Sequence, residues 1–217
     1  YRSNSGPNPG GFLGQPWVAV DPFDPELVYA LCNVHAVGSG GPLDVHFVRS
    51  EDGGRTWSTP ARVNDDLPDG QAWQWFAMLS VAPNGRLDAV WNDTRNDPGN
   101  PNPETSELYY SFSADGGRIW APNVAVSPPF NHFLGWPQQQ KLGDYNHMVS
   151  DSLGVHVAYA ATFNGEQDVY YLRIGSSDCN QNDVPDEDDL SLGTSADGDE
   201  NEIPDECDAA VLRVPLV

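Results

Sequence analysis

An octapeptide that occurs twice constrains the fold of this chain more than any other feature. SEDGGRTW at residues 50–57 is repeated as SADGGRIW at residues 113–120. A strand-like run leads into each copy, DVHFVRS (44–50) into the first and ELYYSFS (107–113) into the second. A third run at the same phase, DVYYLRI (168–174), lacks the octapeptide. Repeat periods of roughly 40 to 60 residues with several strands in each unit are typical of β-propeller blades. The sequence therefore predicts one structural unit that occurs about three times.

Further strand-like runs precede each of these segments. They are PWVAV (16–20), LVYALCN (27–33), FAMLSV (76–81), LDAVWND (87–93), HMVSDS (147–152) and VHVAYAA (155–161). In ELYYSFS (107–113) and DVYYLRI (168–174), large apolar or aromatic residues alternate with smaller or polar ones, as half-buried strands require. The linkers 37–42 and 97–106 are rich in turn-forming residues. We expect an all-β, propeller-like fold of about three four-stranded blades over residues 1–175, with a unit of roughly 60 residues.

The chemistry of the octapeptide favours a structural role over a catalytic one. Asp52 can accept hydrogen bonds from backbone N–H groups of its own turn, and Gly54 allows the positive φ of a tight hairpin. Trp57 is expected to fold back on the blade and bury a large apolar surface. The second copy assigns the same roles to Asp115, Gly117 and Trp120.

The pattern Ser-x-Asp-x-Gly-x-Thr-Trp of the first copy resembles the Asp box of bacterial neuraminidase repeats, which occur in sialidase-like β-propellers. The second copy departs from it only at Ile119. WNDTRN (91–96) and GDY (143–145) also resemble segments of secreted proteins of this kind. The resemblance covers about residues 14–174, and it implies that the boxes lie on outer hairpins away from an active-site face.

Sialidase chemistry needs an arginine cluster, a tyrosine nucleophile activated by Glu and an Asp acid/base. About three blades, where a sialidase uses six, cannot supply that set, so we expect a binding protein and keep an exo-glycosidase of sialidase type as the alternative. The candidates for ligand or catalytic contact are Asp93, Arg95, Asp144, Tyr145 and His147. Hydrogen bonding at strand ends is the competing explanation for these residues.

Two other groups of side chains bear on binding chemistry. The aromatic clusters QAWQWF (71–76) and HFLGWP (132–137) fit sugar stacking and blade packing equally well. The five histidines form no HExxH or other zinc spacing, so no catalytic transition metal is expected.

An acidic segment at residues 176–208 carries a second repeat. Thirteen acids and no Lys or Arg occur between Asp178 and Asp208. Two 12-residue frames, 19 residues apart, place candidate Ca²⁺ ligands at positions 1, 3, 5, 7, 9 and 12. The ligands are Asp178, Asn180, Asn182, Val184, Asp186 and Asp189 in the first frame, and Asp197, Asp199, Asn201, Ile203, Asp205 and Asp208 in the second. Solvated disorder is the alternative.

These loops resemble the calcium loops of dockerins and thrombospondin type 3 repeats. Position 6, normally Gly, is Asp183 in the first frame and Glu202 in the second. The segment LSLGTSA (190–196) is short and unfavourable for the helix that a dockerin requires. The thrombospondin-like arrangement is therefore favoured, and it implies that calcium and a disulfide between Cys179 and Cys207 replace a hydrophobic core.

The charge, the cysteines and the start of the chain limit the classes of partner and the cellular setting that we expect. A net charge of −22 disfavours nucleic acid, and no apolar run approaches the roughly 18 residues of a membrane span. A tail disulfide together with a buried thiol at Cys32 fits an extracellular setting. The chain starts without Met or a signal-peptide pattern, so we expect a processed chain or a fragment.

Three blades do not close a ring, so either upstream blades are missing or copies associate through open blade edges. The apolar segment 209–217 is expected to pair with such an edge. We therefore expect a secreted, calcium-binding module with a binding or structural role and a carbohydrate or glycoprotein as its partner. The alternatives are a sialidase-type glycosidase completed outside this chain, and a dockerin-like subunit attached to a scaffold.

Overall fold

The computed structural model describes most of the chain. It covers residues 6–9, 11–35, 42–67, 70–100, 102–135, 141–143, 145–176, 178–180, 182, 184–198 and 204–208. Strands dominate these residues, and the two helices, α1 (Asp186–Leu192) and α2 (Asp205–Asp208), both lie in the acidic segment. Neither helix is long and apolar enough to span a membrane.

Three antiparallel sheets follow one another along the chain. The first sheet has the order β1 (Trp17–Val20), β2 (Val28–His35), β3 (Leu43–Ser50), β4 (Ala61–Arg62). The second has the order β5 (Gln74–Val81), β6 (Leu87–Asp93), β7 (Thr105–Ser113), β8 (Val124–Ala125), and β9 (Phe130–Asn131) also pairs with β7. The third has β10 (His147–Ser150), β11 (Gly154–Ala161) and β12 (Asp168–Gly175). The predicted strands and the three blade-like units are confirmed, with three strands in the described part of the last unit.

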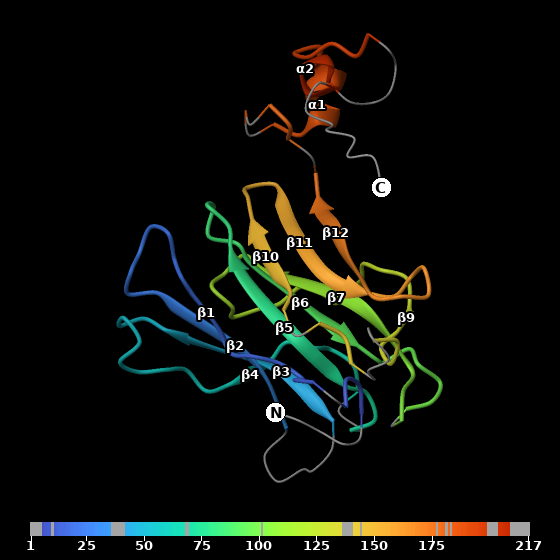
Figure 1. Cartoon of the computed structure of the whole chain (residues 1–217). Coiled ribbons are helices and arrows are strands. Elements are labelled where there is room, and N and C mark those ends of the chain that lie inside the picture. The colour runs from blue at the N-terminus through green and yellow to red at the C-terminus, as the bar shows by residue number, and fades with distance from the viewer. Residues whose placement is uncertain are drawn as a thin grey trace.

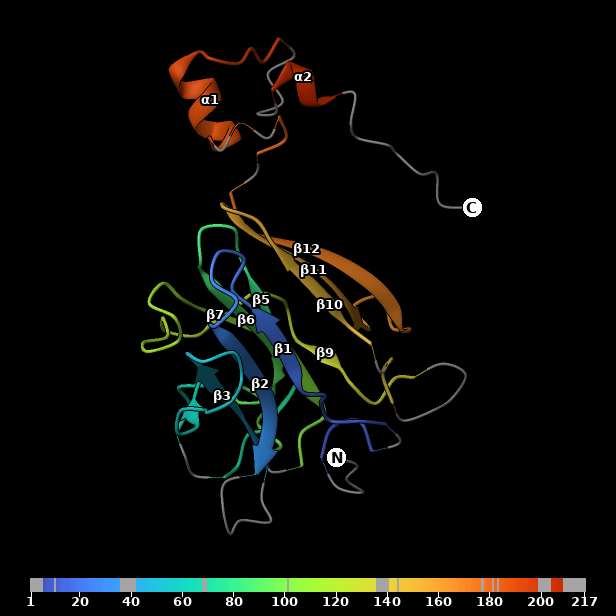
Figure 2. The same ribbon diagram turned by 90° about the vertical axis from the view of Figure 1, so that its left-hand side faces the viewer.

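The second sheet lies between the other two (Figures 1 and 2). A first interface joins Leu31 and Phe47 of the first sheet to Trp91 of the second. A second interface joins Val90 and Leu108, on the other side of the second sheet, to the third sheet. Each fully buried side chain of this size contributes about 1.5–3 kcal/mol, so these two interfaces hold the stack together. Trp73, Trp75 and Phe76 of the QAWQWF cluster belong to the second interface, which decides in favour of blade packing for them.

Both octapeptides form the predicted turn. In the first copy, Asp52 Oδ1 accepts hydrogen bonds from the N–H groups of Arg55 and Thr56 at 2.9 and 2.8 Å, and Ser50 Oγ accepts one from Gly54 at 2.8 Å. The side chain and backbone of Thr56, together with the Ser50 hydroxyl, lower the pKa of Asp52 to about 2. In the second copy, Asp115 accepts from the N–H groups of residues 118 and 119 in the same way. The boxes are therefore structural turns, and their second glycines have positive φ as predicted.

The two box tryptophans differ in their surroundings. Trp120 packs edge-on against Phe47 of the first sheet, with ring centroids 5.3 Å apart. Trp57 remains 43% exposed, and its indole N–H donates to Gly54 O at 3.1 Å. The expectation that Trp57 is buried is therefore wrong. The physical reason is that a box tryptophan packs on the preceding sheet, and no sheet precedes the first one among the described residues.

The acidic segment lies beyond the end of β12, apart from the sheets (Figure 1). Cys179 and Cys207 form the predicted disulfide, with Cα atoms 5.8 Å apart, and Cys32 is a free, half-buried thiol. The expectation that no helix follows the first loop is wrong, because α1 begins at its ninth position. Four acids in the first turn interact favourably with the helix dipole, and Gly193, at φ 69°, ends the helix. Segment 209–217 lies outside the described residues.

Candidate functional site

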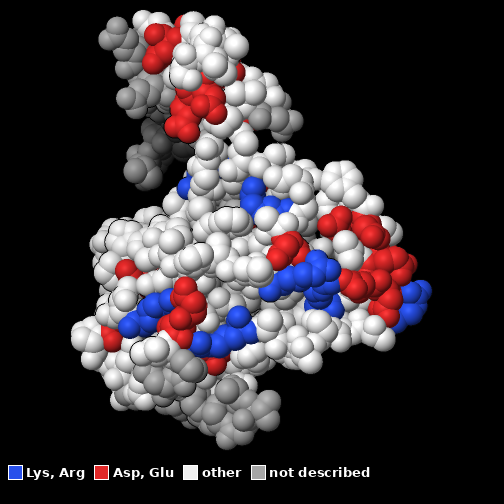
Figure 3. Space-filling view, turned by 180° about the vertical axis from the view of Figure 1, so that it is seen from behind, with Lys and Arg blue, Asp and Glu red and all other residues white. Residues whose placement is uncertain are grey.

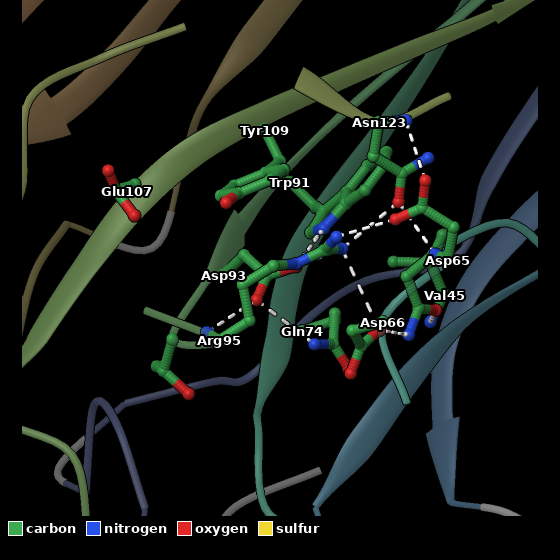
Figure 4. Close-up of polar contacts among 12 residues, drawn as sticks. Val45, Asp65, Asp66, Gln74, Trp91, Asp93, Arg95, Glu107, Tyr109 and Asn123 are labelled. Carbon is green, nitrogen blue, oxygen red and sulfur yellow. Dashed lines mark hydrogen bonds and ion pairs between the residues drawn. The ribbon is translucent and has the colours of Figure 1, made fainter. Parts of the chain in front are cut away.

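Asp93 ends β6 and lies fully buried between the first two sheets. Its Oδ2 accepts a hydrogen bond from the Trp91 indole at 2.9 Å, and its Oδ1 accepts one from Gln74 Nε2 at 3.1 Å. Arg95 adds its backbone N–H to Oδ1 at 2.8 Å and its guanidinium to Oδ2 at 2.8 and 3.0 Å. The carboxylate is thus held by donors from two strands and from the following loop (Figure 4).

The Arg95 guanidinium is shared among several acceptors. Besides Asp93 it donates to Asp65 Oδ1 at 2.6 Å and to Asn123 Oδ1 at 3.0 Å, and its Cζ lies 4.2 Å from the centre of the Tyr109 ring. Burial opposes the charge, but the hydrogen bonds and charge of Asp93 dominate and raise the pKa of Arg95. Arg95 therefore ties the end of β6 to Asp65, in the loop after β4, and to Asn123, which precedes β8 (Figure 4).

Asp66 extends this network toward the first sheet. Its carboxylate lies 3.7 Å from Arg95 and accepts hydrogen bonds from Arg62 at 2.9 Å and Asn64 at 2.7 Å. Burial, together with the charge of Asp93, raises the pKa of Asp66 despite the opposing hydrogen bond from Asn64. Buried carboxylates with raised pKa values cluster at functional sites, although structural ion-pair networks perturb pKa values as well.

A cavity of about 450 Å³ opens beside this network. Its volume lies in the range of small-ligand sites, and its lining is mostly polar. The lining residues are Asp66, Leu67, Gln71, Ala72, Arg95, Asn96, Asp97 and Asn100. The carboxylates of Asp66 and Asp97 can accept hydrogen bonds from ligand hydroxyl groups, whereas the amide N–H groups of Asn96 and Asn100 already donate within the protein.

Among the other predicted contact residues, Tyr145 lies at a different and smaller cavity. Tyr145 precedes β10 and is 84% exposed, and it lines a space of about 30 Å³ together with Trp17 and Phe76. His147 begins β10, and its ring centroid lies 5.9 Å from that of Trp17. Phe76 has a φ of 52° at a bulge in β5, an unusual conformation for a non-glycine residue. Asp144 lies outside the described residues.

The first acidic loop gathers its predicted ligands around Asp189. The side-chain amides of Asn180 and Asn182 donate to Asp189 Oδ2 at 3.1 and 2.8 Å, and Thr194 donates to Oδ1 at 2.6 Å. The Thr194 hydrogen bond is the main cause that lowers the pKa of Asp189. Asp178 Oδ1 accepts from the N–H of Asn182 at 3.1 Å. Positions 1, 3, 5 and 12 of the frame thus converge.

The ninth position of each frame closes its loop in the same way. Asp186 Oδ1 accepts the N–H of Cys179 at 2.9 Å, and Asp205 Oδ1 accepts the N–H of Gly198 at 2.7 Å. Asp199, Asn201 and Ile203 lie outside the described residues, as does the side chain of Asp208. The described oxygen donors of the first loop are the ligand type that Ca²⁺ prefers.

The charges of the sheets are arranged differently from those of the tail. On the face in Figure 3, Lys and Arg side chains of the sheets lie beside Asp and Glu side chains, so this face presents no continuous basic surface. A nucleic-acid backbone would require such a surface.

Neither a protein-family model nor a curated protein sequence matches this chain. Among solved structures it is similar to a Hadza microbial sialidase, with a TM-score of 0.50 and 16% identity over 73% of this chain and 34% of that chain. The fold is sialidase-like. Weaker similarity extends to a Penicillium chrysogenum alpha-L-arabinanase complexed with arabinobiose, with a TM-score of 0.41 and 13% identity over 72% of this chain and 44% of that chain. The chain therefore spans about a third of the sialidase, and the likeness concerns the fold of that part.

Sequence reasoning missed Asp65, Asp66 and Asn123, which complete the Arg95 network. Asp65 and Asp66 follow the short strand β4 as a doublet, and Asn123 precedes β8. Polar residues are common in turns after strands, so nothing in the local sequence marks these three as site residues. They are recognised only because the fold brings Asp65 into contact with Asn123, 58 residues later in the sequence.

Proposed function

We propose that this chain is a glycan-binding module that holds its ligand in the polar cavity beside Arg95. The observation that carries the proposal is the cavity itself, of about 450 Å³, with carboxylate, amide and guanidinium groups on its wall. Sugar hydroxyls can donate to the carboxylates of Asp66 and Asp97 in the lining. The sialidase-like fold supports carbohydrate as the ligand class by analogy.

Binding is favoured over sialic acid cleavage by the state of Arg95. Its guanidinium is already paired with Asp65 at 2.6 Å and Asp93 at 2.8 Å, and it stacks on Tyr109. A substrate carboxylate would have to displace one of these carboxylates from a mostly buried group, which costs more than it gains. A fluorogenic sialoside tests the alternative, and turnover that disappears in Arg95→Lys would establish it.

Glycan binding is expected to depend on Asp66 and Asn100. A glycan array with the full chain, followed by calorimetry with the strongest glycan and with sialyllactose, measures it. We expect Asp66→Asn to weaken binding by about tenfold or more, because it removes a charged acceptor for a ligand hydroxyl. We expect Asn100→Ala to weaken binding as well, because the Asn100 amide holds the loop that lines the cavity through Thr94 O and Asp97 O. Glu166→Gln, on the exposed β11–β12 hairpin, is the matched control and should bind normally. Equal binding by all four proteins would refute this site.

We also propose that the first acidic loop binds Ca²⁺ through Asp178, Asn180, Asn182, the Val184 carbonyl, Asp186 and Asp189. The convergence of its side chains on Asp189 supports this assignment. The second frame, with Asp197 and Asp205, is proposed as a second site because its ninth position closes the loop identically. The ion would neutralise neighbouring carboxylates, so binding and ordering of the tail are expected to be coupled.

Calcium removal is expected to loosen the tail. Calorimetric titration of the full chain with Ca²⁺ should give saturable binding, and EDTA should increase proteolysis between residues 178 and 208. Asp189→Ala should weaken binding by about tenfold or more, because it removes a carboxylate ligand. Glu187→Gln lies outside the ligand positions, is exposed and serves as the control. The absence of binding heat at millimolar Ca²⁺ would exclude the site.

A disulfide and calcium loops together suit an oxidising, calcium-rich extracellular compartment, which we propose as the location. The dockerin-like alternative gains one specific observation, because α1 and α2 both begin at the ninth position of their frames. Capture of a scaffold partner that depends on calcium and is lost in EDTA would favour that alternative.

A further inference from the structure

We infer that two copies of this chain pair through the two outer faces of their three-sheet stack. The first end face is the side of the β1–β4 sheet turned away from β5, and it carries Val18, Val20, Ala30, Val34 and Val48. The last end face is the side of the β10–β12 sheet turned away from β5, and it carries Val149, Ala158, Val169 and Tyr171. The two sheets lie at opposite ends of the stack (Figures 1 and 2).

Strand register identifies the last end face as the counterpart of a buried surface. Phe47 pairs with Leu31, Tyr110 pairs with Val90, and Tyr171 pairs with Ala158, so the aromatic residue has the same place in each sheet. The residue two positions before it is 0% exposed at Val45, 0% at Leu108 and 80% at Val169. The first two are covered by the next sheet. The third has the same apolar character and lies open.

The first end face corresponds to the surface with which the second and third sheets pack on the sheet that precedes each of them. Trp91 and Leu79 of the second sheet are buried against the first sheet, and Val157 and Met148 of the third are buried against the second. On the corresponding side of the first sheet, Val18 is 64% exposed. A single chain therefore displays both halves of an inter-sheet contact, one at each end.

The box tryptophans supply the specific contact. Trp120 packs on Phe47, and a Cβ on Gly117 would lie 2.1 Å from the same ring, so the second box fits closely onto the first sheet. The counterpart of Trp120 is the half-exposed Trp57, and the counterpart of Phe47 is Tyr171, which is 67% exposed. Docking the first end face of one copy on the last end face of another places Trp57 against Tyr171 in the same arrangement.

On the last end face, the described side chains Arg173 and His156 both interact with Asp151 within the same chain. Arg173 forms an ion pair with Asp151, and His156 Nε2 lies 2.9 Å from Asp151 Oδ2. The contact is heterologous, since the first end face and the last end face differ. In the dimer, the first end face of each copy packs on the last end face of the other copy, so that all four faces are covered. Burial of the exposed valines and aromatic rings drives the association.

Sedimentation of the full chain over a range of concentrations tests the pairing. We expect a dimer, and we expect Val169→Glu, Val18→Glu and Trp57→Ala each to weaken it by about 100-fold or more, since each face loses apolar contact at its centre. Val124→Glu on β8 replaces a valine that is 49% exposed and lies outside both faces, and this variant should dimerise normally. Circular dichroism and thermal unfolding verify that each variant is folded. A monomer at all concentrations, or a dimer insensitive to these substitutions, would overturn the inference.

A mixing experiment tests the heterologous geometry. Val18→Glu leaves the last end face intact and Val169→Glu leaves the first end face intact, so a mixture of the two monomeric variants should recover a mixed dimer with one intact contact. A tryptophan fluorescence change on mixing that is absent when Trp57 is replaced would report the predicted contact. Loss of the dimer in only one of the two single variants would indicate a like-to-like contact and would overturn the proposed geometry.

Discussion

Gly117→Ala is expected to lower the stability of the sheets by about 3 kcal/mol or more. The residue has a φ of 81°, where an alanine is strained by about 1–2 kcal/mol. A Cβ would also lie 2.1 and 2.4 Å from two carbons of the buried Phe47 ring, which cannot move without disturbing the first interface. Denaturant unfolding measures the loss, and for a chain of this size the melting temperature should fall by about 10 °C.

Gly54→Ala is the matched control for this substitution. Gly54 has the same place in the first box and a φ of 85°, but a Cβ added there would lie 3.7 Å from its nearest neighbour, a ring carbon of Trp57. Only the backbone strain of about 1–2 kcal/mol is then expected, measured at concentrations where the chain is monomeric. Equal losses in the two variants would show that backbone strain alone decides the result, contrary to the packing argument.

Asp93→Ala is expected to cost about 3–5 kcal/mol, because it removes one partner of a buried ion pair and leaves the other charged. The substitution also strips the Trp91 indole and the Gln74 amide of their acceptors in a fully buried setting. The loss should appear in denaturant unfolding. The variant should also bind the glycan more weakly at a temperature where it is folded, because Arg95 lines the cavity and would lose its orientation.

Asp65→Ala is the control for the loss of an Arg95 partner. Its side chain is about half exposed and pairs with the same guanidinium at 2.6 Å. Exposed ion pairs contribute about 0.2–1 kcal/mol, so the variant should remain close to wild type in stability. A large loss with Asp65→Ala and a small one with Asp93→Ala would contradict the burial argument for this cluster.

Local patterns were sufficient for the strands and turns. Strand-like runs located the long described strands, because at least one side of each is buried against a neighbouring sheet, and β5 and β6 of the middle sheet are buried on both sides. The Asp and Gly residues of each box specify a turn through hydrogen bonds within a few residues, so they could be interpreted without knowledge of the rest of the chain. The pairing of Cys179 with Cys207 was expected because the two residues bracket the acidic segment.

Long-range convergence decided what the patterns left open. Trp57 and Trp120 have equivalent sequence contexts, yet only Trp120 is packed, because burial depends on whether another sheet precedes the box. Helix α1 was missed because it begins inside the loop frame, and the acids of its first turn are also typical loop ligands. Asp93 and Arg95 were found as candidates, but their partners Asp65 and Asn123 belong to other segments and carry no shared motif.

The sequence by itself determined the repeat, its all-β character, the box turns and the acidic loops, since each depends on spacing along the chain. The tertiary structure decided which charges meet at Arg95, which cavity forms beside them and which two apolar faces stay uncovered. These features arise where sheets stack, and stacking brings together residues whose separation in the sequence bears no relation to their distance in space.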